Sequence, residues 1–93
     1  MNKEIRKIGL EMKPIFEKHQ VKKASVFGSF ARGENNKNSD IDILVELKRG
    51  KTLIDLEMDI EKRVKRKTDL ITFKSINPLI KKSILRDEVK IYG

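Results

Sequence analysis

Apolar residues spaced three or four positions apart predict three helices in this chain. The first covers about residues 2–19, where Pro14 either kinks the helix or starts a second short one. The second covers about residues 52–67, with Thr52 as its N-cap and Asp55 in the place of a capping-box acid. The third is expected to begin with Asn77 as its cap and Pro78 at its first position.

Segments rich in strand-forming residues alternate with these helices. They cover residues 21–27, 40–47, 69–73 and, as a short final strand, 89–92. In the second of them apolar and polar side chains alternate, so Ile43 points to one face of a sheet and Asp42 to the other. A helical turn over residues 29–32 and a polar loop over 34–39 join the first two strands.

The order of these elements predicts the fold class. The helix over residues 52–67 joins two strands as a crossover, which makes those strands parallel neighbours. The first strand reaches the second through a short connection that allows either orientation. We therefore expect one α/β (α+β) domain over residues 1–93, with a small mixed sheet of three to four strands and helices packed mainly on one face.

Composition narrows the chemistry that such a domain can carry. The chain has no Cys and one His, which excludes disulfides, thiolate or His-rich metal sites and Cys nucleophiles. No apolar run approaches the roughly 18 residues of a membrane span, and the first residues do not resemble a secretory leader. We therefore expect no contact with a membrane and an intracellular, cytoplasmic location.

The chain is strongly basic. Its 22 Lys and Arg against 14 Asp and Glu give a net charge of +8, which favours polyanionic partners: nucleic acid, nucleotides or an acidic protein surface. The alternative is a solvated, Lys-rich surface without a role in binding. One Tyr, four Phe and no Trp supply a poor stacking platform for single strands, so nucleic-acid binding stays an open question.

Residues suited to chemistry concentrate in the segments 28–33 (GSFARG) and 40–42 (DID). Gly28, at the end of a predicted strand, allows the backbone to approach a ligand closely. Ser29 opens a helical turn, where free amides and the helix dipole favour an anion, and its hydroxyl adds a donor. The two residues predict a small phosphate cradle, although Gly-Ser alone is more often a plain turn.

Three carboxylates accompany this cradle. Asp40 and Asp42 project from one face of a strand, where their repulsion makes ionisation costly and a divalent cation relieves it. Asp69 opens the next strand and lies at the same edge if the strands are parallel. Oxygen ligands completed by phosphate favour Mg²⁺ over Zn²⁺, and three carboxylates can hold two ions. The alternatives are a turn or cap role for Asp40 and an ordinary strand-start role for Asp69.

The pattern Gly-Ser, ten residues, Asp-x-Asp resembles the signature of the nucleotidyltransferases related to DNA polymerase beta. The stretch GSFARGENNKNSDIDILVEL is similar to the minimal nucleotidyltransferase branch, the MNT-type antitoxins found beside HEPN-domain toxins. The resemblance covers about residues 21–73.

This resemblance implies a role for each motif residue. Gly28 and Ser29 would hold the phosphates of ATP, and Asp40 and Asp42 would ligate Mg²⁺. Asp69 would be the third ligand and would activate the acceptor hydroxyl. In this branch the reaction is the transfer of AMP from ATP to a Tyr hydroxyl of the partner toxin, which silences it.

The role of Arg32 and the identity of the partner stay open at this point. Arg32 matches a position that the branch usually fills with Arg, and it either contacts phosphate or pairs with a neighbouring acid. Because so small a domain leaves its site open on one side, we expect the HEPN-type toxin or a second copy of this chain to complete it. The alternatives are an antitoxin that acts by binding alone, a basic nucleic-acid-binding protein, and an enzyme that modifies a small molecule such as an aminoglycoside.

Overall fold

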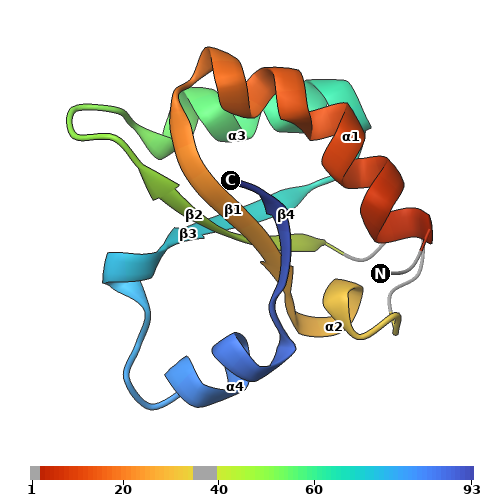
Figure 1. Cartoon of the computed structure of the whole chain (residues 1–93), viewed down its shortest axis with the longest axis vertical. Helices are drawn as coiled ribbons and strands as arrows, with labels where there is room; N and C mark the ends of the chain where they lie inside the picture. Colours follow the sequence, from red (N-terminus) through yellow and green to blue (C-terminus); the bar gives the residue numbers. More distant parts are fainter. Residues whose placement is uncertain (1–2, 35–39) are drawn as a thin grey trace.

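A four-stranded sheet with its two longest helices on one face forms the framework of the chain in a computed structural model that describes residues 3–34 and 40–93 (Figure 1). The helices are α1 (Lys3–Lys18), α2 (Gly28–Ala31), α3 (Leu53–Val64) and α4 (Lys81–Asp87), with a 3-10 turn η1 (Phe73–Ser75). The strands are β1 (Val21–Phe27), β2 (Ile41–Leu47), β3 (Thr68–Thr72) and β4 (Val89–Tyr92).

The sheet is mixed, as the order of elements predicts. Its strand order is β3-β2-β1-β4. The crossover through α3 makes β2 and β3 parallel, while β1 pairs antiparallel with both β2 and β4. The prediction of a small mixed sheet of three to four strands is therefore confirmed, and the short final strand lies at one edge.

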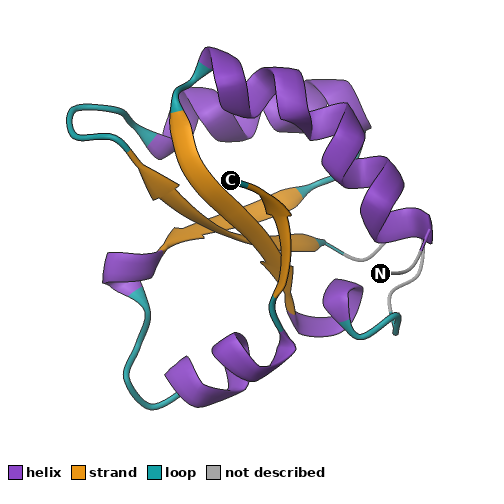
Figure 2. Cartoon of the chain, viewed as in Figure 1, coloured by secondary structure: helices purple, strands orange, loops and turns teal. Residues whose placement is uncertain are grey.

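The two faces of the sheet are covered unequally (Figure 2). Helices α1 and α3 lie on one face, where the main core contains the fully buried side chains of Met12, Phe16, Ile43, Leu56 and Ile60. The other face carries α4 over a smaller cluster of Leu44, Ile76 and Ile84. Within the described ranges, no helix has the length and apolar character needed to cross a bilayer.

Helix α1 is continuous through Pro14, so this residue neither ends the helix nor starts a second one. Pro14 cannot donate to the carbonyl of Leu10, one turn earlier. Both residues lie on the exposed side of the helix, where water can satisfy that carbonyl. A proline on the buried face of the helix would carry a larger cost, because water could not reach the carbonyl that it leaves unpaired.

The start of helix α4 differs from the sequence prediction. The helix begins at Lys81 and not at Pro78. The side chain of Asn77 accepts a hydrogen bond from the Leu79 amide at 2.9 Å, and the Ile80 amide donates to the Asn77 carbonyl at 3.0 Å. Asn77 therefore closes a turn, a conformation that the fixed φ of Pro78 suits as well as a helix start.

Smaller details also differ from the predictions or lie beyond them. Helix α3 ends at Val64 and not near residue 67, and Phe73 lies in η1 and not in β3. Thr52 is the N-cap residue of α3, but its side chain makes no capping hydrogen bond. Strand β3 begins at Thr68, one residue before the predicted start. The polar loop predicted for residues 34–39 lies outside the described residues, except for Glu34.

Candidate active site

The end of β1 brings the predicted phosphate cradle against the second strand. Phe27 is paired with Asp42 across the antiparallel β1–β2 ladder, and Gly28 follows directly. Gly28 has a φ of +69°, a region that side chains disfavour. A Cβ at this position would lie 2.5 Å from Oδ2 of Asp42. A glycine is therefore required here both by the backbone and by the approach of the carboxylate.

The short helix α2 is fixed by the side chain of Phe30. This ring is 1% exposed, and the Arg66 guanidinium lies 5.5 Å from its centroid. After the helix, the Glu34 amide donates to the Ser29 carbonyl at 2.9 Å and closes the turn. Amides in the first turn of a helix have no intrahelical acceptor. The anchored turn thus presents donor groups next to Asp42, as the phosphate cradle requires.

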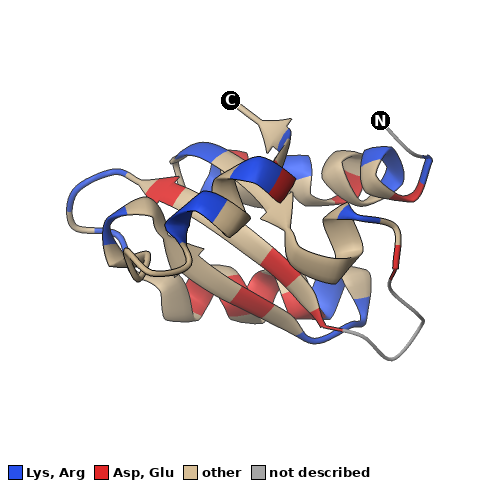
Figure 3. Cartoon of the chain, turned by 90° about the horizontal axis from the view of Figure 1, so that it is seen from below, with Lys and Arg blue, Asp and Glu red and all other residues tan. Residues whose placement is uncertain are grey.

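Two of the predicted carboxylates are neighbours on parallel strands. Asp42 on β2 is in register with Asp69 on β3. The adjacent residues Ile43 and Leu70 point into the main core, so both Asp side chains lie on the opposite face of the sheet. Figure 3, which views that face, shows acidic stretches on neighbouring strands. Asp69 is exposed, and Asp42 is half-buried.

Asp40 lies just before β2 and is exposed. Two-residue spacing along an extended chain places it on the same side as Asp42. The structure therefore brings Gly28, Ser29, Asp42 and Asp69 to one end of the β1–β2–β3 sheet, with Asp40 at the entrance to that end.

The electrostatics of this group centre on Asp42. Burial raises the pKa of the Asp42 carboxyl above its usual value, and the negative charges of Asp69 and then Asp40 raise it further. The positive charge of Arg32 lowers the pKa of Asp42, as the smallest of the four effects. Three like charges close enough to oppose ionisation form a site that a cation stabilises.

The carboxylate ligands have the right chemistry for a hard divalent cation, but their positions do not form a complete coordination shell. Carboxylate oxygens are the ligands that Mg²⁺ prefers, and Asp42 with Asp69 can supply them from adjacent strands. Among the described residues, however, no group of three or more His, Cys, Asp or Glu converges closely enough to hold a metal ion. Mg²⁺ typically keeps water and takes substrate phosphates as further ligands. The chain can therefore supply part of a coordination shell that a nucleotide completes.

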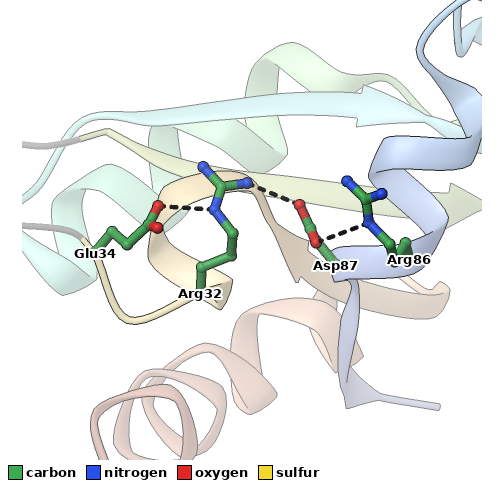
Figure 4. A network of polar contacts seen from close by, with 4 residues as sticks. All are labelled: Arg32, Glu34, Arg86 and Asp87. Carbon is green, nitrogen blue, oxygen red and sulfur yellow. Dashed lines mark hydrogen bonds and ion pairs between the residues drawn. The ribbon is translucent and has the colours of Figure 1, made fainter.

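Arg32 pairs with acids in this structure, which is one of the two roles that the sequence leaves open. Its Nε donates to Oε2 of Glu34 at 2.8 Å, and an Nη donates to Oδ2 of Asp87 at 2.7 Å (Figure 4). These two hydrogen bonds raise the pKa of Arg32. Arg86 adds a weaker contact, 3.7 Å from the other oxygen of Asp87. The network ties the end of α2 to the end of α4.

Asp87 is a site neighbour that the sequence analysis missed. It lies 55 residues from Arg32 along the chain, and its side chain is 15% exposed. No local spacing or motif marks it, because its position depends on α4 packing on the same face of the sheet as Asp42, opposite α1 and α3. Only the three-dimensional fold identifies it as the second acid that pairs with Arg32, beside Glu34.

With this geometry defined, comparison with known proteins identifies the class. Residues 11–93 match the family model described as "Polymerase beta, Nucleotidyltransferase". The chain belongs to this family, and it is a nucleotidyltransferase.

The relatives of the chain narrow this class. It is 44% identical over 90 residues to a protein of Methanocaldococcus jannaschii named "Putative protein adenylyltransferase MJ0435", covering 94% of this chain and 97% of that protein. It is 35% identical over 82 residues to "Protein adenylyltransferase MntA" of Thermococcus cleftensis, covering 85% of this chain and 83% of that protein. The fold is similar to a crystal structure of a toxin-antitoxin with AMP-PNP, with a TM-score of 0.77 at 19% identity, over 91% of this chain and 73% of that chain.

Proposed function

We propose that this nucleotidyltransferase is a Mg²⁺-dependent protein adenylyltransferase that transfers AMP from ATP to a Tyr hydroxyl of a HEPN-type toxin and so acts as its antitoxin. The observation that carries the proposal is the approach of the Gly28 turn to Asp42, with Asp69 beside it on the parallel strand. The protein adenylyltransferase names of its relatives support AMP transfer to protein. The toxin-antitoxin complex of the same fold supports a toxin partner and an ATP-like substrate.

The motif residues then divide the work between binding and proton transfer. The backbone at Gly28 and the amide and hydroxyl of Ser29 bind phosphate oxygens, and Asp40, Asp42 and Asp69 are the residues that would hold Mg²⁺. The chemistry that Mg²⁺ supplies when bound is charge neutralisation at the phosphates and a lower pKa for the attacking hydroxyl.

The transfer itself needs one bond to form and one to break. The acceptor oxygen attacks the α-phosphorus of ATP, the bond from that phosphorus to the bridging oxygen breaks, and pyrophosphate leaves. Asp69 accepts the proton of the acceptor hydroxyl, because it is the exposed carboxylate of the register pair. Asp42 is half-buried behind it and faces the Gly28 turn, where the nucleotide phosphates bind.

Intact-mass spectrometry tests the proposal directly. The chain is mixed with ATP, Mg²⁺ and the product of its neighbouring gene, and Asp42→Asn is run in parallel. We expect mass gains of one or more AMP units on the partner, absent with the variant. A stable complex without any mass gain would overturn the enzymatic proposal and leave an antitoxin that acts by binding alone.

A further inference from the structure

A basic hollow lies at the other end of the two strands that carry the candidate active site. It has a volume of about 240 Å³ and is formed by the ends of β2 and β3, the loop over residues 48–51, and η1. In Figure 3 the loop after β2 is drawn almost wholly in the colour of Lys and Arg. We call this feature, lined by residues 45–51 and 72–74, the basic hollow.

The charges of the basic hollow are unbalanced. Among the residues that the structure describes, four cations line it against the single acid Glu46, and they are Lys48, Arg49, Lys51 and Lys74. Within residues 3–34 and 40–93, none of the four lies within ion-pair distance of a carboxylate. Like charges crowded in one concave place repel, so an anionic partner is the chemistry that this hollow favours.

The aromatic residue of the hollow is already occupied by a cation. Nζ of Lys23 lies 4.4 Å from the ring centroid of Phe73 and brings a fifth positive charge to the region. A ring covered in this way has one face fewer for a nucleic-acid base, and no other aromatic residue in the described part of the chain lines the hollow. Carboxylate side chains fit the site better than stacked bases, because they need charge but no platform.

The basic hollow and the candidate active site share one face of the sheet. Residues 42, 44 and 46 of β2 alternate with the core-facing residues, so Asp42 and Glu46 point to the same side. Four residues at about 3.3 Å each separate them by about 13 Å along the strand. Leu44, between them, is fully buried under Ile76 and Ile84, so a peptide that spans this distance passes along the edge strand β3 and not over β2. About four residues then separate its acceptor hydroxyl from the group in the hollow.

We propose that the basic hollow is a docking subsite for an acidic segment of the acceptor protein, which aligns the acceptor hydroxyl with the Asp42–Asp69 pair. This inference rests on the proposed transfer of AMP to protein and adds the recognition of the acceptor. It separates two kinds of contact: the carboxylates act on the reacting atoms, whereas the hollow holds the acceptor by charge at a distance and affects its KM more than kcat.

The experiment uses two synthetic peptides with one Tyr each. One carries Glu four and five residues to either side of the Tyr, and the other carries Gln at those positions. AMP transfer from ATP is measured by mass spectrometry with the wild-type chain, with Lys48→Glu/Lys51→Glu, and with Lys62→Glu/Arg63→Glu as a control. The control makes the same charge change at exposed positions of α3, on the opposite side of the sheet.

We expect the acidic peptide to have at least a tenfold higher kcat/KM than its Gln counterpart, through KM. Lys48→Glu/Lys51→Glu removes this preference and leaves the Gln peptide unchanged, while the control variant keeps the preference. Equal transfer to both peptides, or equal loss in both variants, would overturn the subsite and leave the proposed function intact.

A binding measurement decides the matter even if no peptide is modified. The anisotropy of a labelled hexaglutamate peptide and of a labelled hexauridylate is measured with the chain carrying Asp42→Asn and no ATP. We expect hexaglutamate to bind in a salt-dependent way and to lose at least tenfold in affinity with the Lys48 and Lys51 substitutions. Tighter binding of hexauridylate, lost with the same substitutions, would overturn the subsite in favour of nucleic acid. Absence of hexaglutamate binding would overturn it as well. Binding of hexaglutamate without AMP transfer to the peptides or to the partner would overturn the proposed function and leave the subsite intact.

Discussion

The two faces of β2 serve different ends, although they alternate residue by residue. Ile41, Ile43 and Val45 are fully buried against α1 and α3. On the other face, Asp42 is half-buried beside a second carboxylate, with its pKa raised. The core face lowers the free energy of the fold through apolar burial, whereas the site face keeps a charge that burial disfavours. Chemistry is therefore confined to one face of the strand, which it shares with the buried side chain of Leu44.

Of the substitutions that test this comparison, one on the core face is expected to have the largest effect. Ile43→Ala removes a fully buried side chain from the centre of the sheet and leaves a cavity. We expect a loss of about 2–5 kcal/mol in the free energy of unfolding, measured by urea denaturation. Leu10→Ala, at a side chain that is 65% exposed on α1, is the control and should change little. Equal losses would contradict the placement of the core.

On the site face, Asp42→Asn should separate activity from stability. We expect AMP transfer to fall by at least about a hundredfold, the scale on which one lost electrostatic contact lowers kcat. The melting temperature should rise, because the variant no longer ionises a half-buried carboxyl beside two like charges. A variant that melts lower than the wild type would show that Asp42 contributes to the fold itself.

The pKa of Asp42 determines how the stability gained by Asp42→Asn changes with pH. The pKa of Asp42 is raised in the folded state, so the folded chain binds the proton more tightly than the unfolded chain. Its contribution to stability is present below the unfolded pKa of about 4 and is lost as pH rises through the folded pKa. The gain in melting temperature from Asp42→Asn should therefore grow from pH 4 to pH 7. Mg²⁺ should raise the melting temperature of the wild type and not that of the variant.

Gly28→Ala should affect both stability and chemistry. The new Cβ meets the Asp42 carboxylate, and alanine must adopt the positive φ that Gly28 has, at a cost of about 1–3 kcal/mol for the backbone alone. Gly50→Ala is a matched control, since Gly50 also has a positive φ, +87°, but nothing within 4 Å of the added Cβ. The difference between the two unfolding free energies measures the contact with Asp42. Equal values would show that this contact relaxes freely.

The smallest effect is expected at the Arg32 network. Asp87→Asn weakens the contact between Arg32 and the end of α4, while Arg32 keeps its pairing with Glu34. Because Arg32 is solvent-exposed, we expect a rise of severalfold at most in KM for ATP and little change in melting temperature. Arg86→Gln, at a 75% exposed side chain, should leave both unchanged. A large loss of activity with Asp87→Asn would give Arg32 a role in the transition state.

The sequence predicted the parts of the site that local pattern and connectivity determine. The crossover through α3 fixes β2 and β3 as parallel neighbours, and the two-residue alternation places Asp42 and Asp69 on the same face. What it could not predict are contacts between distant segments. The Arg32–Asp87 pair spans 55 residues, and His19 contacts Asp59 across 40 residues at 2.6 Å. Such pairs depend on how helices pack, which no spacing along the chain records.

The start of α4 shows a different limit. Asn77 followed by Pro78 suits both a helix cap and a turn, because each needs a side-chain acceptor and a fixed φ. The structure adopts the turn, and the helix starts four residues after Asn77, at Lys81. The local sequence is compatible with both conformations. In the structure, the turn is found together with the packing of Ile84 on the site face of the sheet.

The 2.5 Å that would separate a Cβ added at Gly28 from Oδ2 of Asp42 also bears on how this motif can vary. The two halves of the motif are a single steric unit, although they lie far apart in the sequence. A larger residue at position 28 meets both the carboxylate and the positive φ, so a shorter residue at position 42 removes only one of the two costs. Glycine is therefore the residue that this motif can least exchange, whatever stands at position 42.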